Sequence, residues 1–252
     1  MQRIIISGCC GHMGRVVADI CNNDPEVEIA AGIDLLAQPM EGFPVFSTPA
    51  LCAVETDVVI DFSHPAALEP LLDFCLEKKL PVVLATTGYT DEQLAQIDQA
   101  SRHIPIFRSA NMSLGINVLA DLVRRAAALL GEDFDVEIEE RHHRRKLDAP
   151  SGTALMLANV AAGALPYDPS FVYDRHSVRK PRDRAEIGIS SLRGGTIVGD
   201  HTVVFAGRDE VIEISHHAAS REVFAAGAVK AAKFLAGAAS PGLYDMSHLI
   251  AR

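Results

Sequence analysis

A basic run followed by a turn of small residues carries the clearest chemistry in this chain. Residues 141–146 read Arg-His-His-Arg-Arg-Lys, and the chain then turns at Pro150 into three small residues, Ser151, Gly152 and Thr153. Proline cannot continue a helix, and Ser151 is a good N-cap for a helix over 153–160. The N–H groups of Ser151, Gly152 and Thr153 could then bind a carboxylate. Cations beside a helix N-terminus favour a small anion that carries more than one negative group.

Two side chains of the basic run are candidates for proton transfer. Lys146 beside a bound dianion would stay protonated and could deliver a proton. On a helix, His142 and Lys146 would share a face, because they lie four residues apart, whereas His143 would point elsewhere. There are two alternatives to an anion site. One is a solvated basic face, and the other is a metal site at the two histidines, for which no third ligand has matching spacing. We predict an anion site and no metal.

Three glycines near the N-terminus predict a dinucleotide site. Gly8, Gly11 and Gly14 follow an apolar run and precede a helical pattern, which is where a pyrophosphate meets backbone N–H groups. Asp34 ends the next apolar run, about 20 residues beyond the loop, where a carboxylate can accept ribose hydroxyls. The spacing GxxGxxG differs from the usual GxGxxG, so an ordinary strand-to-helix turn is the alternative.

The residues near Asp34 bear on the choice of cofactor. An arginine or lysine beside the ribose acid binds the 2′-phosphate of NADPH. Here Leu35 follows Asp34, and the glycine loop carries His12. The Asp34 carboxylate would also repel a phosphate. We therefore predict NADH as the preferred cofactor, with NADPH as the second choice.

The elements that must position the glycine loop alternate between strands and helices up to residue 111. This alternation of strands and helices predicts a Rossmann-like α/β domain with a doubly wound parallel sheet. The expected strands are 3–7, 27–33, 58–62, 81–85 and 105–107. The expected helices are one that ends at Asn22 and two that span 65–79 and 91–102.

The pattern changes in the second half of the chain. A long helix over 114–130 precedes strands at 134–140, 185–192, 196–205 and 210–216, the last three without helices between them. This predicts a second, α+β domain with an open mixed sheet. A final helix over 221–236 is expected to dock back on the first domain.

Two domains follow from these patterns. We predict a dinucleotide-binding domain at 1–112 and 218–252 and a substrate-binding and oligomerisation domain at 113–217. The polar segment 167–184 is expected to be a mobile, solvated loop. It holds several basic residues: Arg175, Arg179, Lys180, Arg182 and Arg184.

Composition excludes several classes of protein. The chain has 252 residues, 48% of them hydrophobic, and a net charge of −10, which argues against nucleic acid or an anionic membrane as a partner. No apolar run reaches the ~18 residues that a membrane span needs, and no leader pattern opens the chain. The five cysteines include no CxxC pair, and a disulfide between adjacent Cys9 and Cys10 would be strained. We expect reduced cysteines and a cytoplasmic protein.

A family resemblance rests on the basic run. Residues 139–154 read EERHHRRKLDAPSGTA, which closely resembles the signature of the 4-hydroxy-tetrahydrodipicolinate reductases, also called dihydrodipicolinate reductases. Other segments that resemble this family cover nearly the whole chain: 8–14, 61–65, 85–88, 109–117, 198–205 and 242–246.

The resemblance implies an activity and a set of residues. A nicotinamide hydride would go to ring C4 of 4-hydroxy-tetrahydrodipicolinate with loss of water, in the diaminopimelate route to lysine. His142 would match the catalytic histidine and Lys146 the proton donor. The implied substrate-binding residues are His143, Lys146, Ser151, Gly152 and Thr153. The implied cofactor-binding residues are Gly8, Cys9, Cys10, Gly11, His12, Met13, Asp34, Ala85, Thr86, Thr87, Ser109, Ala110, Asn111 and Met112.

The resemblance also implies a homotetramer joined through the central sheets, with a hinge motion that closes over the substrate. The chain departs from the commonest family pattern at His12 and Leu35, where arginine is frequent, and at Ala85, where glycine is frequent. These departures concern the choice of cofactor. One alternative is a semialdehyde dehydrogenase, which needs a cysteine nucleophile in the second domain, but no cysteine follows Cys75. The other is an NADH sensor, which would need no second anion site.

Overall fold

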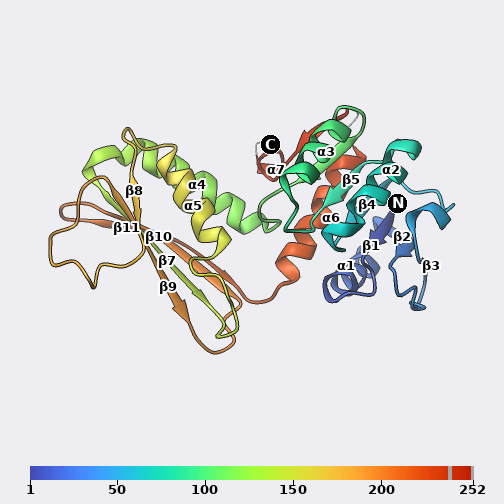
Figure 1. The fold of residues 1–252 in the computed structure, drawn as a ribbon, viewed down its shortest axis with the longest axis horizontal. Helices are drawn as coiled ribbons and strands as arrows, with labels where there is room; N and C mark the ends of the chain where they lie inside the picture. The colour runs from blue at the N-terminus through green and yellow to red at the C-terminus, as the bar shows by residue number, and fades with distance from the viewer. Residues whose placement is uncertain (238–239, 251–252) are drawn as a thin grey trace. The chain divides into compact units, whose positions relative to one another are not determined.

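The computed structural model describes residues 1–237 and 240–250. The chain forms two compact units (Figure 1). The first combines residues 1–113 with the described residues from Glu222 onward, and the second is Leu114–Arg221. Residues 238–239 and 251–252, which belong to the dinucleotide-binding domain expected from the sequence, lie outside the described residues. In the described part of the chain, no helix has the length and apolar character to cross a membrane.

Seven strands of the described chain form a parallel sheet in the first unit, in the order β12-β6-β5-β4-β1-β2-β3. Their bounds are β1 (Gln2–Ser7), β2 (Val27–Ile33), β3 (Val45–Phe46), β4 (Val58–Asp61), β5 (Val82–Leu84), β6 (Pro105–Arg108) and β12 (Gly242–Tyr244). The strand order reverses between β1 and β4, and such sheets bind ligands beyond the carboxyl ends of their strands at this point. The predicted Rossmann-like sheet is confirmed.

Helices cover both faces of this sheet (Figure 1). They are α1 (His12–Asn22), η1 (Pro49–Leu51), η2 (Pro65–Ala67), α2 (Leu68–Lys78), α3 (Asp91–Ser101), α6 (Glu222–Ala236) and α7 (Ser247–Ile250). On one face, α2 and α3 pack into a core that includes Leu71, Ile97 and Val59. On the other, α1 and α6 pack against each other and the strands. Burial on both faces explains why the strands read as continuous apolar runs.

Helix α6 joins the first unit through one very close contact. A Cβ on Gly227 would lie 1.7 Å from the carbonyl oxygen of Met112, so only glycine allows this approach. Lys233 of the same helix forms ion pairs with Asp24 at 2.5 Å and Glu26 at 2.8 Å. The helix expected over 221–236 therefore does return to the first unit.

The second unit holds a mixed sheet of five strands, again counted in the described chain, in the order β11-β10-β7-β9-β8. Its elements are α4 (Leu114–Leu130), η3 (Gly131–Asp133), β7 (Asp135–His142), α5 (Gly152–Ala162), β8 (Ser170–Val172), β9 (Glu186–Arg193), β10 (Gly199–Ala206) and β11 (Val211–Ala218). Strand β10 is antiparallel to both neighbours, whereas β7, β9 and β8 are parallel. Helices α4 and α5 close one face over Val136 and Phe205. The predicted open mixed sheet is confirmed.

The basic run is not helical, which corrects one premise of the sequence analysis. Strand β7 continues through His142, which pairs with Arg193 of β9. The His142 carbonyl oxygen accepts the N–H of Gly194 at 2.9 Å, so the sheet ladder holds this residue extended. Lys146 follows in a turn. His142 and Lys146 therefore do not share a helix face.

The arginine-rich segment 167–184 is not simply a solvated loop. Arg182 donates to Asp135 at 2.6 Å and to Glu137 at 2.9 Å, both on β7. Arg175 also donates to Glu137, at 2.6 Å. The expectation of a solvated loop is wrong for these two arginines, because both pair with Glu137, which lies about 40 residues away in sequence and comes close only in the sheet.

Candidate functional site

Close backbone contacts explain the glycines of the β1–α1 loop. Gly8 has a φ of 78°, and a Cβ there would lie 2.6 Å from the carbonyl oxygen of Phe62. A Cβ on Gly14 would lie 2.1 Å from the Gly8 carbonyl oxygen. Gly11 is the N-cap of α1 and gives the first helical N–H groups no side-chain acceptor. The loop therefore has the close approach and the N–H groups that a pyrophosphate requires.

Asp34 is fixed beside this loop. Its Oδ2 accepts the N–H of Cys10 at 3.0 Å, and its Oδ1 accepts the N–H of Leu36 at 3.0 Å. The intervening Leu35 side chain is 86% exposed. The carboxylate at the end of β2 is thus held where ribose hydroxyls could donate to it.

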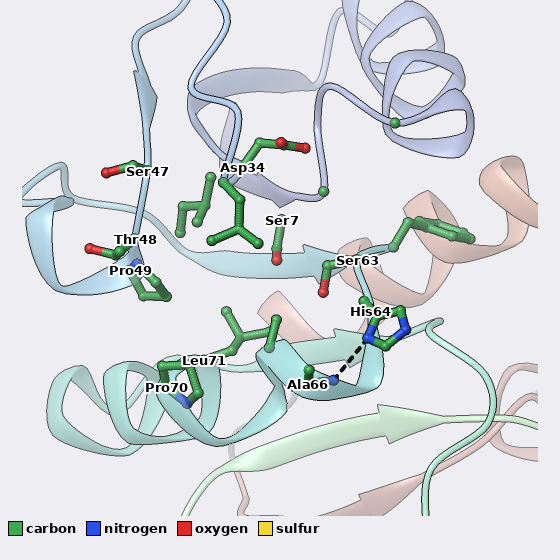
Figure 2. Close-up of a pocket in the computed structure, with 16 residues that line it drawn as sticks. Ser7, Asp34, Ser47, Thr48, Pro49, Ser63, His64, Ala66, Pro70 and Leu71 are labelled. Carbon is green, nitrogen blue, oxygen red and sulfur yellow. Dashed lines mark hydrogen bonds between the residues drawn. The ribbon is translucent and has the colours of Figure 1, made fainter.

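A pocket of about 450 Å³ opens at the carboxyl ends of β1, β2 and β4. Figure 2 shows Asp34 and Ser47 on one side of it and Pro70 and Leu71 on the other. Its lining comprises Ser7, Gly8, Gly11, Ile33, Asp34, Leu35, Ser47, Thr48, Pro49, Phe62, Ser63, His64, Ala66, Ala67, Pro70 and Leu71. An apolar lining with a few polar groups is typical of a cofactor site.

Asp61 connects the loops that follow neighbouring strands. Ser63 Oγ donates to its carboxylate at 2.6 Å and Thr86 Oγ1 at 2.7 Å. Burial raises the pKa of the Asp61 carboxyl, and these hydrogen bonds oppose the rise. Thr86, a predicted cofactor residue, is therefore positioned by a residue to which the sequence analysis gave no role.

The predicted cofactor segments all follow strands of the one parallel sheet. Residues 8–13 follow β1, Asp34 follows β2, 85–87 follow β5 and 109–112 follow β6. The carboxyl ends of parallel strands lie at the same edge, so the fold brings these segments to one side of the first unit. In the last segment, the Asn111 side-chain oxygen accepts the N–H of Ser113 at 2.8 Å.

Cys9, Cys10 and Asp34 form a further group in this loop. One ligand atom from each lies within 4.8 Å of the others, a spacing that could hold a metal ion. Burial raises the pKa of the Cys9 thiol to about 12, which disfavours the thiolate that a metal requires. The two sulfurs are 4.0 Å apart, within reach of a thiol hydrogen bond, and form no disulfide. We assign no metal to this group.

In the second unit, His142 is a buried residue at the end of β7. Its Nδ1 donates to Glu140 Oε2 at 2.6 Å, because a carboxylate is an acceptor only. The ring lies edge-on to His201, with centroids 5.2 Å apart. A Cβ on Gly199 would lie 3.1 Å from His142 Nε2, so any other residue at position 199 would crowd that nitrogen.

Lys146 lies in the turn after β7. Its N–H donates to the His143 carbonyl oxygen at 3.1 Å, and its Nζ is 2.8 Å from Asp148 Oδ1. The hydrogen bond from Lys146 lowers the pKa of the Asp148 carboxyl, and the backbone of Gly152 contributes to the same effect. The cation expected to bind an anion therefore holds a carboxylate of this chain.

The turn before α5 has the predicted cap but not all of the predicted N–H groups. A cis peptide bond joins Ala149 and Pro150, and Ser151 Oγ accepts the N–H of Ala154 at 3.1 Å. The N–H of Ser151 donates to Glu140 Oε1 at 3.1 Å. The expectation that this N–H binds a substrate carboxylate is therefore wrong, since a buried carboxylate occupies it.

His143 has an unsatisfied ring nitrogen. Its Nδ1 is buried and has no hydrogen-bond partner within the described chain. Burial lowers the pKa of this histidine, and the nearby cations Arg221 and Arg145 lower it further. A neutral ring with an unsatisfied nitrogen suits a residue that contacts a ligand.

Two family models together match almost the whole chain. The model described as "Dihydrodipicolinate reductase, N-terminus" matches residues 2–112, and "Dihydrodipicolinate reductase, C-terminus" matches residues 115–250. The chain belongs to the dihydrodipicolinate reductase family. The resemblance stated from residues 139–154 is confirmed. Membership of this family argues against both alternatives, a semialdehyde dehydrogenase and an NADH sensor.

Individual dihydrodipicolinate reductases match over their full length. The 4-hydroxy-tetrahydrodipicolinate reductase of Caldanaerobacter subterraneus subsp. tengcongensis is 54% identical and that of Clostridium novyi 47% identical, each over 99% of this chain and 98% of the relative. The solved dipicolinate-bound dihydrodipicolinate reductase from Paenisporosarcina sp. TG-14 is similar in fold, with a TM-score of 0.82, 25% identity and 97% of both chains covered.

Three residues that connect to the predicted ones in the second unit were not predicted from the sequence: Glu140, Arg193 and His201. A signal for Glu140 was present, because it continues the inward-facing alternation of Val136 and Ile138. A charged residue in such a position needs a buried partner. The identity of the partner could not be read from the sequence, since Arg193 lies 53 residues away.

Proposed function

We propose that this protein reduces 4-hydroxy-tetrahydrodipicolinate to tetrahydrodipicolinate with NAD(P)H and loss of water, in lysine biosynthesis through diaminopimelate. The observation that carries the proposal is membership of the dihydrodipicolinate reductase family over residues 2–112 and 115–250. Relatives of this name match over 98% of their length. In this proposal, the first unit binds the cofactor, and the second binds the dicarboxylate and carries the oligomer contacts.

The first unit fits a nicotinamide dinucleotide. The backbone of the chain itself leaves no room for a Cβ at Gly8 or Gly14, so the loop keeps the tight turn that brings its N–H groups toward a pyrophosphate. The pocket beside Asp34 is large enough for an apolar ring. The bound nicotinamide supplies a hydride to the substrate. The loop of residues 8–13 would hold the pyrophosphate and Asp34 the ribose, while residues 85–87 and 109–112 contact the rest of the cofactor.

Within that site, we propose a preference for NADH. The Asp34 carboxylate is held toward the loop by the Cys10 N–H, and a 2′-phosphate there would meet a negative charge. The next side chain, Leu35, offers no cation. Comparison of kcat/KM for the two cofactors tests this proposal, and a large advantage of NADPH would contradict it.

In the second unit, the residues around the turn bind and protonate the substrate. Lys146 would pair with one carboxylate and hold a proton at Nζ beside the charge that develops on the ring nitrogen. His142 would present Nε2 to the reacting ring. His143, the Ser151 hydroxyl and the backbone of Gly152 and Thr153 would bind the carboxylates.

A coupled assay tests the reaction, because the substrate is unstable and must be generated in place. We expect the wild-type protein to oxidise NADH only when the substrate is being formed. Lys146→Ala should lower kcat strongly, weaken binding of pyridine-2,6-dicarboxylate and leave NADH affinity nearly unchanged. Lys180→Ala, at an exposed lysine of the 167–184 segment, is the matched control. Normal turnover by Lys146→Ala would contradict the assignment of the proton donor.

We also propose a homotetramer in the cytoplasm. The face of the second sheet opposite α5 carries exposed apolar residues, with Val211 58% and Leu192 50% exposed. Such residues favour contact with another subunit. The five cysteines are unpaired, as is usual in a reducing compartment. Light scattering on the eluting protein measures the subunit number, and a monomer would contradict this proposal.

A further inference from the structure

Glu140 is a buried carboxylate at the centre of the second unit's polar cluster. Its side chain is 0% exposed, although it lies on a strand whose outer neighbours face solvent. An ionised carboxylate in such a place needs several donors, because desolvation of a lone charge costs several kcal/mol. The donors that it has come from three different elements.

The strongest of these contacts is with Arg193 of β9. Arg193 donates to Glu140 Oε1 at 2.6 Å and to Oε2 at 2.8 Å, a bidentate pair that fixes the plane of the carboxylate. Arg193 also donates to the carbonyl oxygen of Asp148 at 2.7 Å. The pair therefore anchors the turn that follows the basic run.

Each oxygen of Glu140 also holds a residue of the proposed site. Oε2 accepts from His142 Nδ1 at 2.6 Å, and Oε1 accepts the N–H of Ser151 at 3.1 Å. One carboxylate thus fixes both the histidine at the end of β7 and the residue that caps α5. Burial alone would raise the pKa of Glu140, but hydrogen bonds from Arg193 and its other partners lower it to about 2. The acceptor is therefore ionised at neutral pH.

We propose that Glu140, oriented by Arg193, is a positioning residue for the reaction. It holds the proton of His142 on Nδ1 and so keeps Nε2 as the nitrogen that faces the substrate. It also holds Ser151 at the start of α5, where the dicarboxylate binds. This inference rests on the proposed function, because it assigns Glu140 an effect through two residues of that site.

The neighbouring glutamate is a matched control. Glu139 is 55% exposed and forms an ion pair with Arg141 at 3.3 Å. It lies on the outer face of the same strand, so Glu139→Gln changes the charge by the same amount without touching the cluster. We expect that variant to turn over like the wild type.

The test is Glu140→Gln, which keeps the shape but replaces one acceptor oxygen with a donor. We expect kcat to fall roughly 100-fold, as for a misplaced reacting group, and pyridine-2,6-dicarboxylate to bind more weakly, while the Kd of NADH stays within about twofold. Nitrogen NMR of labelled histidine should place the His142 proton on Nδ1 in the wild type and shift it in the variant. Glu140→Asp should recover part of the rate.

Two results would overturn the proposal: wild-type kcat in Glu140→Gln, or lost activity with an unchanged His142 tautomer. If Glu140→Gln does not fold, Arg193→Lys takes its place, because it keeps the positive charge but cannot form the bidentate pair with Glu140. Failure of the proposed function would look different, since the wild type itself would not turn over. The tautomer and the binding of pyridine-2,6-dicarboxylate would still test the role of Glu140.

Discussion

The Lys146 ammonium lies 2.8 Å from the carboxylate of Asp148, two residues further along the chain. The backbone of Gly152 also helps to lower the pKa of the same carboxyl group. These are two of the groups that we assign to the substrate carboxylate. Asp148 therefore occupies, within the chain itself, the kind of position that a bound dicarboxylate would take. If Lys146 binds the substrate as proposed, the substrate must displace this carboxylate.

From this competition we expect Asp148→Asn to bind pyridine-2,6-dicarboxylate more tightly than the wild type. The Asp148 side chain is 56% exposed, and exposed ion pairs contribute about 0.2–1 kcal/mol, so affinity should rise by a factor of roughly 1.4 to 5. Calorimetric titration in the presence of NADH measures it. Asp174→Asn, at another exposed carboxylate, is the control. Weaker binding by Asp148→Asn would instead mean that Asp148 supports the substrate site.

Leu35→Arg should move cofactor preference toward NADPH. The Leu35 side chain is 86% exposed, so the substitution places a cation beside Asp34 at little cost to the fold. An arginine paired with a 2′-phosphate should raise kcat/KM for NADPH by roughly tenfold. Leu36→Arg, one residue further along, provides a positional control. An equal change for both cofactors would show that this position does not sense the ribose phosphate.

Gly227→Ala should destabilise the first unit. Its Cβ would lie 1.7 Å from the Met112 carbonyl oxygen, so α6 must move away. Forcing atoms into a packed contact costs about 1–3 kcal/mol. Urea unfolding gives the change in the free energy of unfolding. Gly163→Ala is the control, because a Cβ there would lie 3.4 Å from the Asn159 carbonyl oxygen, an ordinary contact distance. Since Met112 belongs to the proposed cofactor segment, NADH affinity should fall as well.

His201 should make stability depend on pH in the weakly acidic range. Burial lowers its pKa from 6.5 to about 4, so the unfolded chain binds a proton that the folded protein does not. Stability is therefore complete above pH 6.5 and is lost as pH falls toward 4. By pH 4.5 the loss from this group should be about 2 kcal/mol.

Urea unfolding at pH 7.5, 5.5 and 4.5 measures that loss. His201→Asn should show a shallower decline, whereas His217→Asn, at a largely exposed histidine of β11, should follow the wild type. The effect of Glu140 on stability falls at lower pH, between its ordinary pKa of 4.5 and about 2. It therefore changes the free energy of unfolding little at the three pH values of this experiment. Equal slopes for His201→Asn and the wild type would rule out this histidine as the source.

The local features of this fold could be predicted from the sequence. The apolar run at 27–33 and the helical pattern at 114–130 coincide with β2 and α4, because periodicity and chain neighbours decide such elements. Ser151 was expected to cap α5, and it does so through its own hydroxyl. The family could be named from residues 139–154, because a long run of charged and small residues is seldom repeated by chance.

Only the tertiary structure decided which hydrogen-bonding groups of the proposed substrate site are already paired with other groups of the chain. The pairing of β7 with β9 keeps His142 extended and brings Arg193 to Glu140, which no local pattern encodes. Glu140 in turn takes the N–H of Ser151, which the sequence alone had left for a ligand. Side chains that are distant in sequence could accept from the same donors. Sheet register and burial decide which of them forms the hydrogen bond. The sequence by itself determined which chemical groups this protein has, and the fold determined which of them bind one another.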